Sequence, residues 1–89
     1  MTGNGTLKQS SPSCERNKDF ILPVLKEVLP DSGTVLEVGS GTGQHAVYFS
    51  ARLPQLVWQP TDLPENFPSI RAWAAEAGLP NLRAPLELD

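Results

Sequence analysis

The sequence has a single cysteine, Cys14, and so lacks the pair that an internal disulfide requires. It also lacks an apolar run approaching the roughly 20 residues of a membrane span. The ten acidic and seven basic residues are scattered and give a net charge of -3, so no cationic patch for nucleic acid or anionic lipid is evident. These absences favour a cytoplasmic protein whose partners are small molecules or other proteins.

Residues 1–14 have few apolar side chains and are rich in Gly, Ser, Thr and Asn. Such a stretch buries too little surface to offset the entropy lost on ordering. We therefore predict a disordered tail over residues 1–14, without the apolar stretch of a secretory signal, and one folded unit over residues 15–89.

Hydrophobic periodicity predicts alternating helices and strands in the folded unit. Residues 15–29 have helical spacing, but Pro23 requires that this helix either starts near Asp19 or bends there. Strands are predicted over residues 34–38, 56–60 and 82–88. Two further helices are predicted, one over residues 46–53 and one from an N-cap at Ser69 to Gly78. This order predicts an α/β fold with a parallel sheet and right-handed crossovers. Trp58 and Trp73 lie on apolar faces and are predicted core residues.

Residues 37–43 (EVGSGTG) stand where the first predicted strand becomes a helix, the place where an open α/β sheet binds its ligand. The glycines permit a sharp turn, and N–H groups at the helix start favour a carboxylate or phosphate. Gln44 occupies the position where a dinucleotide fingerprint needs its third glycine, and no lysine follows Lys26, as a P-loop would require. Glu37 adds a carboxylate, which would repel a pyrophosphate but attract an ammonium group.

Asp62 ends the second predicted strand, 23 positions after Gly39. A carboxylate at this position can accept hydrogen bonds from both hydroxyls of a ribose, although it could instead cap the turn at Leu63. Together with Glu37 and the glycine loop, Asp62 resembles the pattern of class I S-adenosylmethionine-dependent methyltransferases. In that pattern the loop holds the methionine end of the cofactor and the second acid holds the ribose.

Four blocks extend the likeness to the methyltransferase-like 26 family: residues 15–18 (ERNK), 39–46 (GSGTGQHA), 58–62 (WQPTD) and 85–89 (PLELD). The resemblance implies a Rossmann-like class I methyltransferase fold, truncated after its third strand, with S-adenosylmethionine as cofactor. In that family four more strands follow and hold the rest of the methyl-acceptor pocket. The implied cofactor-binding residues are Glu37, Gly39, Ser40, Gly41, Thr42, Gly43, Asp62, Leu63, Asp89, Arg16 and Asn17.

Some of these roles have alternatives. Arg16 and Asn17 could cap the first helix or close over the methionine carboxylate, and Asp89 could bind the adenine amino group or simply fray. No catalytic residue is assigned, because the sulfonium is already activated and no acid, base or nucleophile has an obvious partner. His45, in the first turn of a helix, is interpreted as structural rather than as a general base. No metal site is predicted.

Two other functions stay open, a non-catalytic module that binds a protein partner and an NAD-binding Rossmann protein. The methyl acceptor, a small molecule or a protein, is unknown at this point. For these 89 residues alone we expect no methyl transfer, because the acceptor pocket is half-built. We also expect self-association, because the strand over residues 34–38 would be left with an unpaired edge.

Overall fold

A computed structural model describes residues 9 and 11–88 of the chain. The elements run in the order α2 (Pro12–Val28), β1 (Gly33–Val38), α3 (Gln44–Arg52), β2 (Leu56–Asp62), the 3-10 helix η1 (Pro64–Asn66), α4 (Phe67–Ala77) and β3 (Leu86–Glu87). This order confirms the predicted alternation of helices and strands.

The three strands form one parallel sheet in the order β1-β2-β3. β1 pairs with β2 from Gly33 opposite Leu56 to Val38 opposite Thr61. The carboxyl ends of both strands therefore lie side by side at one edge of the sheet. The α/β, Rossmann-like fold class is confirmed.

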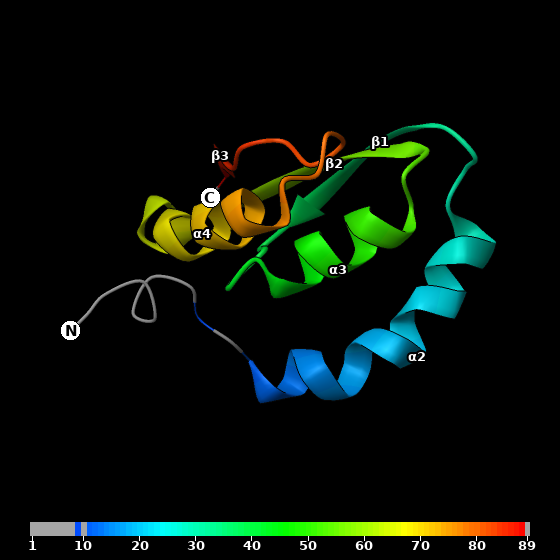
Figure 1. Cartoon of the computed structure of the whole chain (residues 1–89), viewed down its shortest axis with the longest axis horizontal. Coiled ribbons are helices and arrows are strands. Elements are labelled where there is room, and N and C mark those ends of the chain that lie inside the picture. Colours follow the sequence, from blue (N-terminus) through cyan, green and yellow to red (C-terminus); the bar gives the residue numbers. More distant parts are fainter. Residues whose placement is uncertain (1–8, 10, 89) are drawn as a thin grey trace.

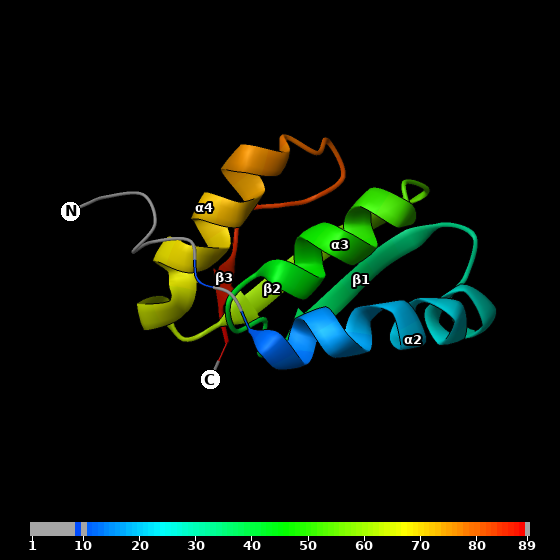
Figure 2. The same ribbon diagram turned by 60° about the horizontal axis from the view of Figure 1, so that its bottom comes forward.

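The helices lie together on one side of the sheet, as two different views show (Figures 1 and 2). Residues of α3, of its C-cap and of β2 form the core between these layers: Ala46, Phe49, Leu53, Leu56 and Trp58. Burial alternates along β1, with Val35 and Glu37 half-buried and their neighbours exposed. On the exposed side Leu36 and Val38 are 59% and 70% accessible to solvent. One face of the sheet is thus packed, and at β1 no described residue covers the opposite face, which we call the bare face.

The first helix begins earlier than predicted. α2 starts at Pro12, so the predicted tail is wrong for residues 12–14, while residues 1–8 and 10 lie outside the described part. Proline suits the first helical position, because no intrahelical acceptor is available there for its missing N–H. The first turn is closed by the Glu15 N–H, which donates to the Ser11 carbonyl at 3.1 Å.

Pro23 lies inside α2, so the predicted alternative of a helix starting near Asp19 is wrong. The ring removes the N–H that would bond the Asp19 carbonyl and crowds that carbonyl. The helix bends along its course in Figure 1, which agrees with the other alternative that the sequence predicted, a bent helix. Residues on both sides of the proline, Ile21 and Leu25 among them, pack against the core.

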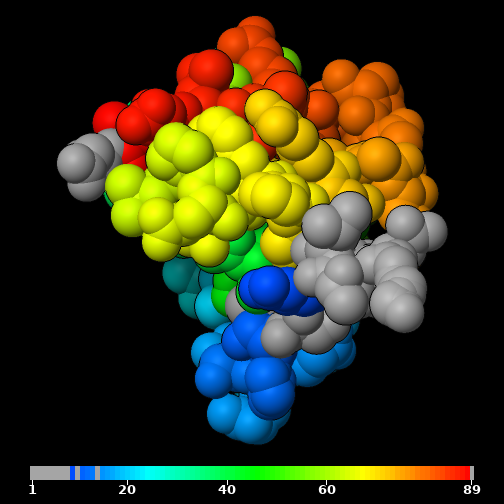
Figure 3. Space-filling model, turned by 90° about the vertical axis from the view of Figure 1, so that its left-hand side faces the viewer, coloured from blue at the N-terminus to red at the C-terminus, as the bar shows by residue number. Residues whose placement is uncertain are grey.

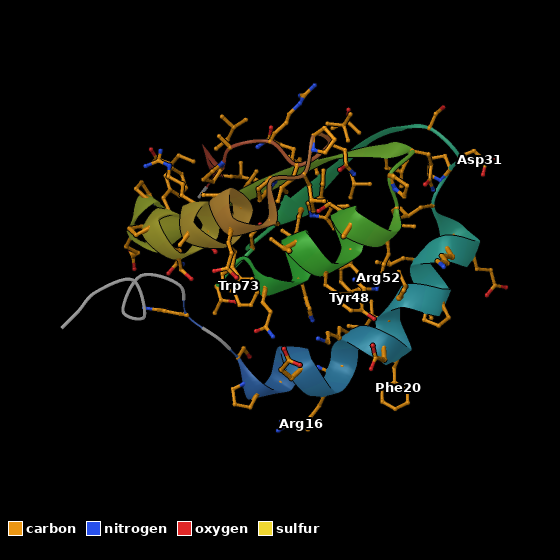
Figure 4. The ribbon with its side chains drawn as sticks, viewed as in Figure 1. Arg16, Phe20, Asp31, Tyr48, Arg52 and Trp73 are labelled. Atoms are coloured by element: carbon orange, nitrogen blue, oxygen red, sulfur yellow. The ribbon has the colours of Figure 1, made fainter. Side chains whose placement is uncertain are left out.

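The contact between α2 and α3 centres on Tyr48. Its hydroxyl donates to Asp19 Oδ1 at 2.5 Å, and this hydrogen bond raises the pKa of Tyr48. The Arg52 guanidinium carbon lies 3.7 Å from the ring centroid and Lys18 Nζ lies 4.8 Å from it. Tyr48 and Arg52 lie between the two helices in Figure 4. These contacts fix the middle of α2 against the core layer.

Ser69 is not the N-cap of α4, contrary to the prediction. The helix begins two residues earlier at Phe67, directly after η1, with proline in its first turn. Ser69 is buried, and its hydroxyl donates to the Thr42 carbonyl at 2.6 Å instead of capping the helix. Gly78 ends α4 as predicted, with φ +60° and an N–H that donates to the Ala74 carbonyl at 3.0 Å.

The last strand is shorter than predicted. β3 covers only Leu86–Glu87, and Leu82 makes an isolated bridge to Trp58. Pro85 has no N–H to give to a ladder, so the alternating apolar residues at 82–88 do not form a continuous strand. The segment still follows β2, because the Arg83 N–H donates to the Trp58 carbonyl at 2.9 Å.

Candidate cofactor site

The glycine loop connects β1 to α3 and is shaped by close packing against α4. At Gly43, with φ +93°, an added Cβ would lie 2.8 Å from the backbone Cα of Ile70, so only glycine fits. Gly39 and Gly41 also have positive φ, but an added Cβ there would meet no atom within 4 Å. The loop is therefore packed at its helix end and open at its first two glycines.

Ser40 and Thr61 fasten this loop to β2. The Ser40 N–H donates to the Thr61 carbonyl at 2.8 Å, and the Thr61 N–H donates to Ser40 Oγ at 3.1 Å. The Thr61 hydroxyl donates to the Glu37 carbonyl at 2.6 Å. Both Ser40 and Thr61 are buried. The loop is consequently held in one conformation by side chains and backbone of the neighbouring strand.

Asp62 faces the loop from the end of β2. The Gly41 N–H donates to Oδ2 and the Leu63 N–H donates to Oδ1, each at 2.6 Å. Burial raises the pKa of Asp62, but the hydrogen bonds from Leu63, Gly41 and the Asn66 side chain outweigh burial and hold the pKa below its ordinary value. Asp62 is thus a carboxylate at neutral pH, and because these three donors use most of its lone pairs it can accept about one further hydrogen bond.

Glu37 lies on the helix-covered face of β1, one residue before the strand ends. Its Oε1 accepts hydrogen bonds from the Ser40 hydroxyl at 2.8 Å and from the Trp58 indole Nε1 at 3.2 Å. The predicted acid before the glycines and the predicted acid after β2 are therefore both hydrogen-bonded to the loop, through Ser40 and Gly41 respectively. The structure brings these residues together at the carboxyl edge of the sheet.

The loop N–H groups are less available than the sequence indicated. We predicted that N–H groups at the helix start would face a ligand. The Gly41 N–H is donated to Asp62, the Gly43 N–H to the Ser40 carbonyl at 3.1 Å, and the Gln44 N–H to Thr42 Oγ1 at 3.2 Å. For these three groups that prediction is wrong, because the tight loop satisfies them internally.

The remaining predicted residues lie at different distances from this site. Leu63 follows Asp62 directly and is 36% exposed, so it offers apolar surface beside the carboxylate. Arg16 and Asn17 are exposed on α2; Arg16 Nη2 donates to Ser13 Oγ at 3.3 Å, and its side chain points away from α3 in Figure 4. The structure does not bring Arg16 to the loop. Asp89 lies outside the described residues.

An interaction that the sequence did not reveal joins the N-terminal segment to the loop through Gln44. Gln44 is buried; its Oε1 accepts the Ser11 N–H at 2.9 Å and its Nε2 donates to Glu15 Oε2. Figure 3 shows the start of α2 in blue close below the yellow-green start of α4, with a narrow green band between them. A glutamine where a glycine might stand was the only sequence signal for this contact.

Ser69 and Trp73 of α4 hold the same N-terminal segment at a second point. Ser69 Oγ accepts the Gln9 N–H at 2.9 Å, and the Trp73 indole donates to the Gln9 carbonyl at 2.6 Å. Trp73 is half-buried, so its prediction as a core residue is wrong, whereas Trp58, 3% exposed, is in the core as predicted. These bonds span 60 or more residues in sequence, which is why periodicity could not show them.

His45 packs rather than pairs. Its ring lies 5.0 Å from that of Phe49, and Nε2 is buried without a hydrogen-bond partner among the described residues. A general base needs an accessible nitrogen and usually an orienting partner, so these surroundings favour the structural interpretation of His45.

Within residues 9 and 11–88 no group of three or more His, Cys, Asp and Glu side chains could hold a metal ion.

The fold and the site define a class: the described residues form a three-stranded part of the Rossmann-like class I methyltransferase fold. The chain belongs to the family described as proteins of unknown function, DUF938, which matches residues 8–89. Its structure is similar to the apo crystal structure of the S-adenosylmethionine-dependent methyltransferase SibL, with a TM-score of 0.70 and 27% identity. The match covers 86% of this chain and 22% of SibL, so the chain spans less than a quarter of that neighbour. In the described part, no helix is both long and apolar enough to cross a membrane.

Proposed function

We propose that this protein binds S-adenosylmethionine at the glycine loop and acts in methyl transfer. The observation that carries the proposal is the Asp62 carboxylate, which the Gly41 N–H holds at 2.6 Å beside the open part of the loop. The likeness to an S-adenosylmethionine-dependent methyltransferase at 27% identity supports the same class. The residue blocks shared with the methyltransferase-like 26 family support a closer kinship with that family.

The residues present fit each part of this cofactor. Asp62, already ionised and oriented, has a lone pair left for a ribose hydroxyl. Glu37 supplies an anionic oxygen for the ammonium of the methionine end. The missing side chains of Gly39 and Gly41 leave the backbone open to close approach, and Leu63 supplies apolar contact for an adenine ring.

When bound, S-adenosylmethionine supplies a methyl group that its sulfonium has already activated. The residues of this chain then have to hold the ribose and the amino-acid end rigidly and keep water away. The hydrogen bonds of Ser40 and Thr61 meet the first need, because they fix the loop before any ligand arrives. No general base from this chain enters the proposal. The acceptor is proposed to be a small molecule or a protein, in line with the net charge of -3.

We further propose that the 89 residues alone bind the cofactor weakly and transfer no methyl group, since the chain spans 22% of its structural neighbour. A cytoplasmic location is proposed on the single cysteine, Cys14. Cell fractionation tests the location, and a radiolabelled methyl-transfer assay with cell extract as acceptor source tests the activity of the chain.

Titration with S-adenosylhomocysteine and with NAD, up to millimolar ligand, tests the proposed binding. We expect a response to S-adenosylhomocysteine and none to NAD; the reverse result would overturn the class of function. Gly41→Val should abolish the response, because its side chain would fill the open part of the loop. Gly78→Val is the matched control, since Gly78 has the same φ of +60° and equally open surroundings but lies at the end of α4.

A further inference from the structure

Glu37 is held at one oxygen only. The Ser40 hydroxyl and the Trp58 indole N–H both donate to Oε1, at 2.8 and 3.2 Å, and no described residue donates to Oε2. A carboxylate fixed in this way has a defined direction for its second oxygen. Oε2 is therefore available to a group that lies outside the described residues, such as part of a ligand.

Trp58 is an unusual donor for this purpose because it is a core residue. The residue is 3% exposed, and its ring lies 5.9 Å from the ring of Phe49. A buried indole N–H needs an acceptor, and here the acceptor is the Glu37 carboxylate. The hydrogen bond therefore joins the rigid core to the edge of the candidate site.

The backbone of Trp58 is itself fixed on the side away from Glu37. Its N–H donates to the Asn81 carbonyl at 2.7 Å, and its carbonyl accepts the Arg83 N–H at 2.9 Å. The Asn81 side chain in turn donates to the carbonyls of Ser50 and Leu56, each at 2.9 Å. The indole thus projects from a strand position that cannot shift without breaking several hydrogen bonds.

We propose that Trp58 is a positioning residue, which pins Oε1 of Glu37 so that Oε2 is presented to the cationic amine of the ligand. The inference rests on the proposed function and extends it to specificity. The site should distinguish adenosyl thioethers that carry an α-amino-acid end from those that lack one. A mobile carboxylate would lose part of this preference, because it must be ordered on binding.

The test replaces the indole N–H without changing the shape of the side chain. Trp58 is substituted by 3-benzothienylalanine, whose sulfur takes the place of the N–H, and the same substitution at Trp73 is the control. Binding of S-adenosylhomocysteine and of 5′-methylthioadenosine, which has no amino-acid end, is measured by NMR titration. At position 58 we expect S-adenosylhomocysteine to bind about tenfold more weakly, the scale of one hydrogen bond to a charged group, and 5′-methylthioadenosine to be unchanged.

Equal weakening of both ligands would show a merely structural role and would overturn the proposal, as would unchanged binding of both. If the unmodified chain bound neither ligand, the proposed function would itself be wrong, which is a different outcome. Introducing Glu37→Gln first should remove the effect of the Trp58 substitution; an undiminished effect in that background would also contradict the proposal.

A measurement on the natural side chain guards against a variant that fails to fold. In Glu37→Gln the indole ¹H–¹⁵N resonance of Trp58 should move markedly, since its acceptor loses its charge, while that of Trp73, whose acceptor is the Gln9 carbonyl, stays in place. An unmoved Trp58 resonance would mean that the indole does not bond Glu37 in solution, and the inference would fall.

Discussion

The glycine-loop end of the sheet and the outer edge of β1 are built in opposite ways. At the loop, polar groups converge and are already paired: Ser40 with Thr61, and Gly41 with Asp62. Along β1 the described residues pair only with β2, and Leu36 and Val38 stay exposed on the bare face. One region is preorganised for a small polar ligand, whereas the other offers backbone groups and apolar surface to another strand. Binding and self-association should therefore respond to different substitutions.

The largest effect is expected from filling the packed end of the loop. Gly43→Ala would place a Cβ 2.8 Å from the backbone of Ile70 at a φ of +93°, so we expect the free energy of unfolding to fall by about 3 kcal/mol. Gly78→Ala, with φ +60° and no neighbour within 4 Å, should cost about 1 kcal/mol. Urea unfolding of both variants measures the difference. Equal losses would mean that Gly43 is needed only for its backbone conformation.

Removing the carboxylate of Asp62 should weaken ligand binding next most strongly. Asp62→Ala is expected to raise the free energy of binding S-adenosylhomocysteine by about 1–3 kcal/mol, the scale of charge-assisted hydrogen bonds. His45→Ala should have a smaller effect, since the ring of His45 packs on Phe49. Calorimetry compares the two variants. The same substitution can be made in an active methyltransferase that contains this sequence. If His45→Ala abolished its methyl transfer while S-adenosylhomocysteine binding was unchanged, the structural interpretation of His45 would be wrong.

At the other region, the chain should associate with a second copy through the edge of β1. Leu36→Lys places a charge beside the unpaired strand edge, and we expect it to weaken the association roughly tenfold, about 1.4 kcal/mol. Phe20→Lys on α2 is the matched control, because Phe20 is 79% exposed yet lies off the strand. Sedimentation velocity over a range of concentrations measures both. If the unsubstituted chain were monomeric, or if Phe20→Lys rather than Leu36→Lys weakened the association, the edge of β1 would not be the contact between copies.

The smallest expected effect is a loss of stability in acid. The pKa of Asp62 is lower in the folded protein than its ordinary value of 3.8. The Asp62 carboxylate therefore stabilises the folded state at pH values above 3.8, and this stabilisation is lost as the pH falls through the pKa of the folded protein. Unfolding measured from about pH 5 to pH 2 should show this loss. Asp62→Asn should show less of it, and identical pH profiles for the two proteins would contradict the hydrogen bonds assigned to Asp62.

The contrast between the two regions also explains what could be predicted from the sequence. Glu37, the glycine loop and Asp62 are close in sequence to strand ends, and the parallel sheet must bring such ends together. The pairing of Gly41 with Asp62 was not predictable, because the internal use of a loop N–H depends on the three-dimensional turn.

Errors at the starts of the helices arose where long-range contacts override local preference. Ser69 has the residue type of an N-cap, but burial against Thr42 gives its hydroxyl a different partner. Pro12 starts a helix inside a stretch whose composition indicated disorder, and Gln44 supplies contacts to Ser11 and Glu15 that no periodicity contains. In each case the deciding partner lies more than 25 residues away or outside the periodic pattern.

The most direct test of the central claim is a ¹H–¹⁵N NMR titration of the chain with S-adenosylhomocysteine, because it locates the ligand as well as detecting it. We predict that the largest shifts fall on the amides of Gly39, Gly41 and Leu63, which surround the Asp62 carboxylate and the open part of the loop. The amides of β1 residues Val35 and Leu36 should change little. Shifts that avoid the glycine loop, or no shifts at millimolar ligand, would contradict the assignment of this site to S-adenosylmethionine.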